Sequence, residues 1–139
     1  MDRGKGFTLL EVLIVVAIVA ILLVLASASY RHYVFRARRA DARQMLMSIA
    51  HAEERWYATY NRYTDDLGKF GYANASSSPG ANYEPLLSLD GEDAQHYVVA
   101  ALPINHQAGD ACGMMTLDST GKKSPDRADA TANANGRCW

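Results

Sequence analysis

The sequence predicts an α+β protein. A long amino-terminal helix, membrane-spanning in its first half, packs on a small antiparallel sheet that ends in a disulfide loop. Three observations lead to this fold class: an apolar run that begins at residue 7, an amphipathic continuation to residue 60 without Gly or Pro, and short strand-like runs separated by turns beyond it. A chain of 139 residues is one domain's worth, and residues 61–139 can bury only a small core.

The apolar run extends from Phe7 to Tyr30 and holds one charged residue, Glu11. A helix needs roughly 20 apolar residues to cross the hydrocarbon core of a bilayer, so residues 7–30 are expected to span a membrane. A charged side chain at the bilayer centre costs roughly 2.5–3.5 kcal/mol on insertion scales. We therefore expect Glu11 to have a functional role and a partner that neutralises it.

A short polar leader, residues 1–6, precedes the run and ends in Gly6. A secretory signal is cut after its apolar region and loses it, whereas a cut between Gly6 and Phe7 keeps the run and creates a new amine at Phe7. That amine lies four residues, about one helical turn, before Glu11, so both groups share one helix face. Between staggered copies, the amine of one subunit would meet Glu11 of the next, and this pairing would select a register.

The second half of the helix, residues 31–60, is predicted to be amphipathic and to complete a single helix from about Thr8 to Tyr60. An apolar stripe with helical spacing is expected to face the sheet, with arginines and acids on much of the remaining surface; it consists of Met45, Ile49, Ala52 and Trp56. Aromatic side chains at the helix end are expected in the core between helix and sheet: Trp56, Tyr57, Tyr60 and Tyr63.

Residues 61–139 are predicted to form the globular head. The helical period breaks at residues 61–68, and residues 73–82 form a loop rich in Ser, Gly and Pro. Strands are expected at 83–89, where Pro85 favours an edge position, at 96–102 and at 112–117. A turn at 118–121 leads to a short return strand at 122–123, and the tail from 124 to 135 is expected to be irregular.

The two cysteines, Cys112 and Cys138, are predicted to form a disulfide, because a single pair in a segment outside the cytoplasm is typically oxidised. The alternative is a pair of free thiols in a cytosolic protein. Basic residues usually mark the cytoplasmic side of a membrane span. Five arginines follow the predicted span and only Arg3 and Lys5 precede it, so the charge distribution favours a cytosolic head and hence free thiols. We give more weight to the leader and the cysteine pair.

The sequence contains no nucleophile elbow, phosphate-binding loop or paired-acid motif. We therefore expect this protein to have no enzymatic activity and to bind no cofactor or metal. The alternatives are a zinc site at His96, His106, Cys112 and Cys138, a calcium site at residues 90–93, and a glycosylation sequon at residues 74–76, and each is less favoured. The head carries six basic and ten acidic residues. Because an acidic surface repels phosphates, nucleic acid is not an expected partner.

The stretch from Gly6 to Glu11, with the apolar run behind it, resembles the class III signal of type IV prepilins. The resemblance implies cleavage between Gly6 and Phe7 by a prepilin peptidase, N-methylation of Phe7, and a role for Glu11 in subunit registration. It also implies a single-pass protein of the bacterial inner membrane with its head in the periplasm, which later enters an extracellular pilus. The implied partners are other pilin subunits, the peptidase and methyltransferase, the assembly platform, and membrane lipid before assembly.

Downstream features resemble the PilE-type minor pilins: Tyr57, Arg62-Tyr63-Thr64, Leu67, Cys112-Gly113 and Cys138-Trp139. Many major pilins carry glycine and proline at the positions of Ala20 and Ala28, and alanine at both favours a minor subunit that helps to initiate or shape the fibre. The alternatives are a pseudopilin of a type II secretion system, a DNA-uptake pilin, and a membrane-anchored domain that is never cleaved.

Overall fold

A computed structural model describes residues 7–72 and 79–139 of the chain. The chain divides into two compact units, Met1–Val34 and Phe35–Trp139, and the helix α1 (Leu9–Tyr60) contributes to both. The predicted leader, including Gly6, and the sequon at residues 74–76 lie outside the described residues.

The first unit consists of the amino-terminal part of α1. Thr8 acts as the N-cap, because its Oγ1 accepts a hydrogen bond of 3.2 Å from the backbone N–H of Glu11. No Gly or Pro interrupts the helix, and its most apolar 18-residue window has a mean hydropathy of 3.3 and contains no buried residue. These properties match a membrane span in length and composition.

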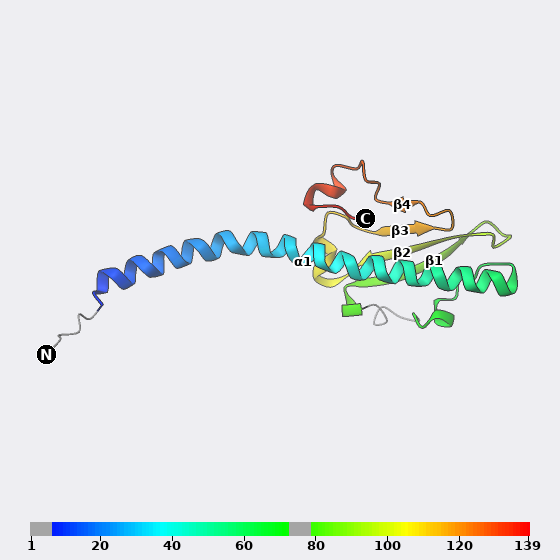
Figure 1. The fold of residues 1–139 in the computed structure, drawn as a ribbon, viewed down its shortest axis with the longest axis horizontal. Coiled ribbons are helices and arrows are strands. Elements are labelled where there is room, and N and C mark those ends of the chain that lie inside the picture. Colours follow the sequence, from blue (N-terminus) through cyan, green and yellow to red (C-terminus); the bar gives the residue numbers. More distant parts are fainter. Residues whose placement is uncertain (1–6, 73–78) are drawn as a thin grey trace. The chain divides into compact units, whose positions relative to one another are not determined.

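The second unit is a four-stranded antiparallel sheet on which the later part of α1 packs (Figure 1). The strands, β1 (Tyr83–Asp90), β2 (His96–Pro103), β3 (Met115–Asp118) and β4 (Lys123–Ser124), follow one another in space as in the chain. The register sets Leu87 opposite Val99 and Val99 opposite Leu117. Because β1 is an edge strand, it accommodates Pro85 as predicted.

Short 3-10 helices occupy several of the connections. They are η1 (Leu67–Phe70), η3 (Pro79–Ala81), η4 (Asn105–Gly109) and η5 (Ala132–Asn135). The last of these lies in the tail, which was expected to be irregular. β3 begins three residues later than predicted, because residues 110–113 form a turn in which the Gly113 N–H donates 3.0 Å to the Asp110 carbonyl. The return strand is displaced by one residue from the predicted position.

The core lies between α1 and the inner face of the sheet. Met45 and Ile49 of α1 are no more than 1% exposed, as their helical spacing predicted, and Leu46 beside them is fully buried as well. They belong to one cluster with residues of the strands and both cysteines, which includes Tyr83, Tyr97, Val99, Met115, Leu117, Cys112 and Cys138. The predicted fold class is therefore confirmed. The core prediction is wrong for two aromatic residues that lie outside this cluster: Tyr60 is 54% exposed, and Trp56 is half-buried with its ring 4.1 Å from that of Tyr60.

Candidate assembly site and head surface

The first candidate site is the beginning of α1. Phe7 is 82% exposed, Glu11 is also exposed, and the two line one shallow groove with Val12, Val15 and Val16. Because the N-cap is Thr8, Glu11 falls in the first helical turn, where unpaired backbone N–H groups favour a negative charge. Phe7, just before α1, and Glu11, in its first turn, therefore lie along one groove at the start of the helix.

Apolar side chains surround this site on every side of the helix. The large hydrophobic residues from Leu9 to Leu25 are each between 47% and 83% exposed. Exposed apolar patches of more than a few hundred Å² mark membrane or protein interaction surfaces. This surface therefore requires a covering of lipid or of other apolar helices.

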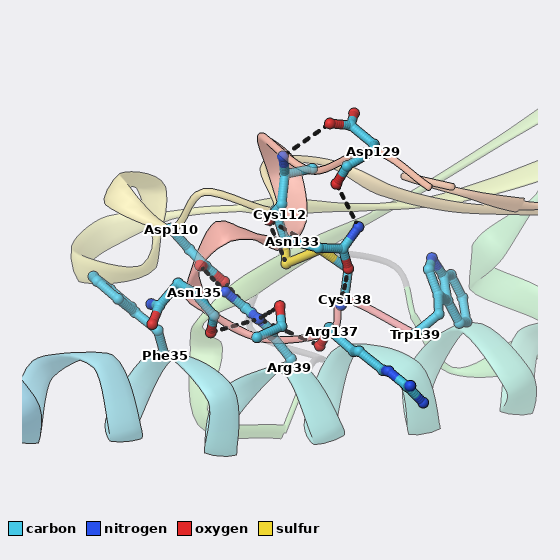
Figure 2. The surroundings of a disulfide bond; sticks show 12 residues. Phe35, Arg39, Asp110, Cys112, Asp129, Asn133, Asn135, Arg137, Cys138 and Trp139 are labelled. Carbon is cyan, nitrogen blue, oxygen red and sulfur yellow. Dashed lines mark hydrogen bonds and ion pairs between the residues drawn. A yellow bond between two sulfur atoms is a disulfide. The ribbon is translucent and has the colours of Figure 1, made fainter. Parts of the chain in front are cut away.

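In the second unit, Arg39 of α1 joins the helix to the carboxyl-terminal tail (Figure 2). Its side chain is buried and forms a two-pronged ion pair with Asp110, in which Nε donates 2.7 Å to Oδ2 and Nη2 contacts Oδ1. Nη1 donates to three successive backbone carbonyls, at 2.7 Å for Gly136 and at 3.3 Å for Asn135 and Arg137. We call this arrangement the Arg39 clamp. The sequence had placed Arg39 among the polar surface residues, which is wrong.

Gly136 can occupy the clamp because it has no side chain. Its φ of +93° favours glycine, and a Cβ atom would lie 2.8 Å from Cδ of Arg36. The tail therefore approaches α1 more closely here than another residue would allow.

A buried glutamine completes the clamp from the side of η4. Gln107 Nε2 donates 3.0 Å to Asp110 Oδ2, 2.9 Å to the hydroxyl of Tyr83, and 3.3 Å to the Phe35 carbonyl. Burial, together with the nearby charge of Asp110, raises the pKa of Tyr83 to about 12. The hydroxyl is therefore neutral at physiological pH, as a hydrogen-bonding core residue should be.

The disulfide predicted between Cys112 and Cys138 is formed, and it closes a loop with a sequence separation of 26 residues (Figure 2). Within the loop, Asn133 Oδ1 accepts 3.0 Å from the Cys138 N–H, and Asp129 Oδ1 accepts 3.0 Å from the N–H groups of Thr131 and Ala132. Because both cysteines are consumed, the alternative zinc site is wrong. Among the residues that the structure describes, no group of three metal-ligating side chains is assembled.

A second surface feature lies beside the tail. A groove of about 600 Å³ is lined by Gly121, Lys122, Lys123, Pro125, Asp126, Arg127 and Trp139. Lys123 Nζ lies 5.1 Å from the centre of a Trp139 ring, and the indole N–H is fixed by a 2.8 Å bond to the Ser124 carbonyl. Asp126 uses Oδ1 to accept 2.8 Å from the Ala128 N–H. We call this feature the tail groove; three of its side chains are cationic and one is a positioned aromatic.

Comparison with known proteins agrees with these observations. The family described as "Type IV minor pilin ComP, DNA uptake sequence receptor" matches residues 28–116, and a prokaryotic N-terminal methylation motif matches residues 1–27. The chain is 29% identical to the type IV major pilin protein PilA of Myxococcus xanthus over 73% of this chain and 45% of that protein. It is 36% identical to the type IV major pilin protein PilE of Neisseria gonorrhoeae over 55% of this chain and 46% of that protein. It thus spans about half the length of these relatives.

A solved type IV pilin from Shewanella oneidensis has the same fold. It is 28% identical, aligns with a TM-score of 0.55, and covers 76% of this chain and 97% of its own. Type IV pilins are structural proteins that assemble with other pilin subunits, and the exposed apolar helix and the small disulfide-closed head fit that class. The chain therefore belongs to the type IV pilin family, and within it to the group described as type IV minor pilin ComP, DNA uptake sequence receptor.

Proposed function

We propose that this chain is a minor subunit of a type IV pilus, which residues 7–30 hold in the inner membrane as a single pass before the fibre incorporates it. The observation that carries the proposal is an apolar helix exposed on all sides, with one acid in its first turn. Residues 1–6 are the leader removed by the prepilin peptidase, residues 31–60 are the amphipathic half of the helix, and residues 61–139 are the periplasmic head.

The same apolar surface of the helix can contact lipid before assembly and neighbouring subunits in the fibre. The apolar side chains exchange lipid for the helices of neighbouring subunits on extraction, and this changes little hydrophobic free energy because both surroundings are apolar. Specificity must then come from close packing and from polar pairs. Glu11 supplies such a pair if the amine of Phe7, freed by cleavage after Gly6, belongs to an adjacent subunit at the assembly platform.

Processing tests this proposal directly. Protein recovered from sheared fibres should give an amino-terminal tryptic peptide that begins at Phe7, ends at Arg31 and carries one added methyl group, as read by mass spectrometry. Gly6→Leu should leave the leader attached and abolish incorporation, whereas the control Gly4→Leu should be processed normally. Protein that still begins at Met1 and is found in membranes but not in fibres would refute the proposal and favour the uncleaved membrane anchor.

A second candidate function is DNA binding by the head. The family description names a DNA uptake sequence receptor, and the tail groove offers Lys122, Lys123 and Arg127 beside the ring of Trp139. Cationic grooves with aromatic side chains suit the phosphates and bases of nucleic acids. The acidic total charge of the head argued against nucleic acid, but a local cluster of cations can act where the total cannot.

The salt dependence of DNA affinity tests whether the cations of the tail groove contact DNA. The full chain in detergent should bind a fluorescent DNA duplex, and the logarithm of the association constant should fall linearly with the logarithm of the salt concentration, with a slope of roughly −0.9 per phosphate contact. Replacing Lys122, Lys123 and Arg127 together by glutamine should weaken binding. It should also make the slope shallower by the amount that about two to three phosphate contacts contribute. The control is Lys69→Gln, outside the groove. Unchanged affinity and slope in the triple variant would show that the tail groove does not bind DNA.

A further inference from the structure

Glu53 is a second acid of α1, and it was expected, like the other charged residues of residues 31–60, on the polar surface of the helix; this expectation is wrong. Glu53 is fully buried, together with the core residues one turn before it. Its Oε2 accepts a 3.2 Å hydrogen bond from the Thr64 N–H, whereas Oε1 finds no donor anywhere in residues 7–72 and 79–139. A buried carboxylate with one unpaired oxygen is unfavourable in its charged form.

The partner of Glu53 belongs to a connecting segment, residues 61–70, that leads from the end of α1 into η1. The Tyr63 hydroxyl donates 3.1 Å to Glu54, and the Tyr63 N–H donates 2.9 Å to the Ala94 carbonyl in the β1–β2 turn. Thr64 Oγ1 accepts 3.2 Å from the Asp66 N–H. The segment is therefore held on one side by two adjacent glutamates of α1 and on the other by the β1–β2 turn.

A cavity of about 270 Å³ adjoins this contact and is lined in part by Trp56, Thr64, Asp65 and Lys69. The segment thus has room on one side and a titratable attachment on the other. Thr64, whose N–H donates to Glu53, lines this cavity, so water in the cavity would reach the Glu53 carboxyl group once the segment lifts.

We propose that Glu53 is a pH-sensitive latch that holds the connecting segment against α1 when it is protonated and releases it when it ionises. The groups that face it come from every element around it: Glu54 on α1, Tyr63 and Asp65 on the segment, Lys69 on η1, and Tyr97 on β2. Burial raises the pKa of Glu53 to about 7 from its ordinary value of 4.5, helped by the charges of Glu54 and Asp65. The Thr64 N–H and Lys69 oppose this shift without cancelling it.

The direction of the effect follows from proton linkage. The closed segment favours the protonated acid, so the open form binds fewer protons in the window between 4.5 and about 7. The closed form is fully favoured below this window, loses stability as pH rises through it, and changes no further above it. Between about pH 5.5 and about pH 8.5, the opening equilibrium should increase roughly tenfold to thirtyfold.

Hydrogen exchange of the full chain in detergent, corrected for intrinsic exchange rates, measures this opening. Amides of residues 62–70 should lose roughly tenfold to thirtyfold protection across that pH range, while amides of β2 such as Val99 should not. Glu53→Gln should make protection independent of pH, and the control Glu54→Gln should retain most of the dependence. Equal protection at both pH values in the wild type, or an unchanged dependence in Glu53→Gln, would overturn the latch.

A second measurement serves if the glutamine variant does not fold. Carbon-13 NMR of the Glu53 carboxyl in the unmodified chain should show a titration midpoint near 7, because burial raises the pKa of this group. A midpoint near the ordinary value of 4.5 would overturn the latch as well.

Discussion

Arg39→Met should destabilise the head by roughly 3–5 kcal/mol, because removing one partner leaves the other buried charge without compensation. Within the described residues, the carboxylate of Asp110 would keep only the bond from Gln107, and the carbonyls of residues 135–137 would lose the bonds from Arg39. Chemical denaturation of the full chain in detergent, followed by near-ultraviolet circular dichroism, measures the loss. The tail and the disulfide loop should become mobile at lower denaturant concentration than in the wild type.

The matched control is Arg55→Met, on the exposed surface of the same helix, which should change stability by about 0.5 kcal/mol or less. The double variant Arg39→Met with Asp110→Leu should recover part of the loss, since an apolar pair can replace a buried ion pair. An Arg39→Met protein as stable as Arg55→Met would show that the clamp contributes nothing to the fold.

Glu11→Ala should be inserted in the membrane and processed normally, yet enter fibres at least a hundredfold less than the wild type. The substitution would leave a neighbour's amine unpaired in an apolar environment, at a cost of roughly 3–5 kcal/mol, which is more than a hundredfold in an association constant. The measurement is the ratio of this chain in sheared fibres to that in membranes, read by quantitative immunoblotting.

Ile14→Ala provides the comparison for Glu11→Ala, because Ile14 lies on the same exposed apolar helix and is 48% exposed. It removes apolar surface without removing charge, so its effect on incorporation should be small. Equal incorporation of Glu11→Ala and Ile14→Ala would take the registration role away from Glu11. Loss of both processing and incorporation would instead indicate a defect before assembly.

Much of the fold follows from residue spacing. The apolar run predicts the span, and helical spacing places Met45 and Ile49 in the core. The buried side of α1 nevertheless begins earlier than predicted, at Arg39 and Ala42, and it includes Glu53 next to Ala52. The helical spacing of Arg39 from Ala42, and of Glu53 from Ile49, already indicated burial. Because charged residues are rarely buried unless paired, both were nevertheless predicted to lie on the surface.

The partners of these two charged residues could not be predicted. Asp110 lies 71 positions from Arg39 in a loop without periodicity, and the Arg39 clamp also uses backbone carbonyls that any residue would supply. The disulfide was predictable because only two cysteines exist. The tail groove was not, because Trp139 and the cations of the β3–β4 region approach one another only through the tail that the disulfide and the clamp hold in place.

The most direct test of the pairing between Glu11 and a neighbour's amine is zero-length carbodiimide cross-linking of purified fibres, followed by trypsin digestion and mass spectrometry. Phe7 and Glu11 fall in one tryptic peptide, so an internal link gives a dehydrated single peptide, whereas a link between subunits gives two joined peptides. We predict joined peptides in which Glu11 of this chain is bonded to the amino-terminal nitrogen of another subunit. Internal links alone, or no link at Glu11 while head carboxylates react, would contradict it.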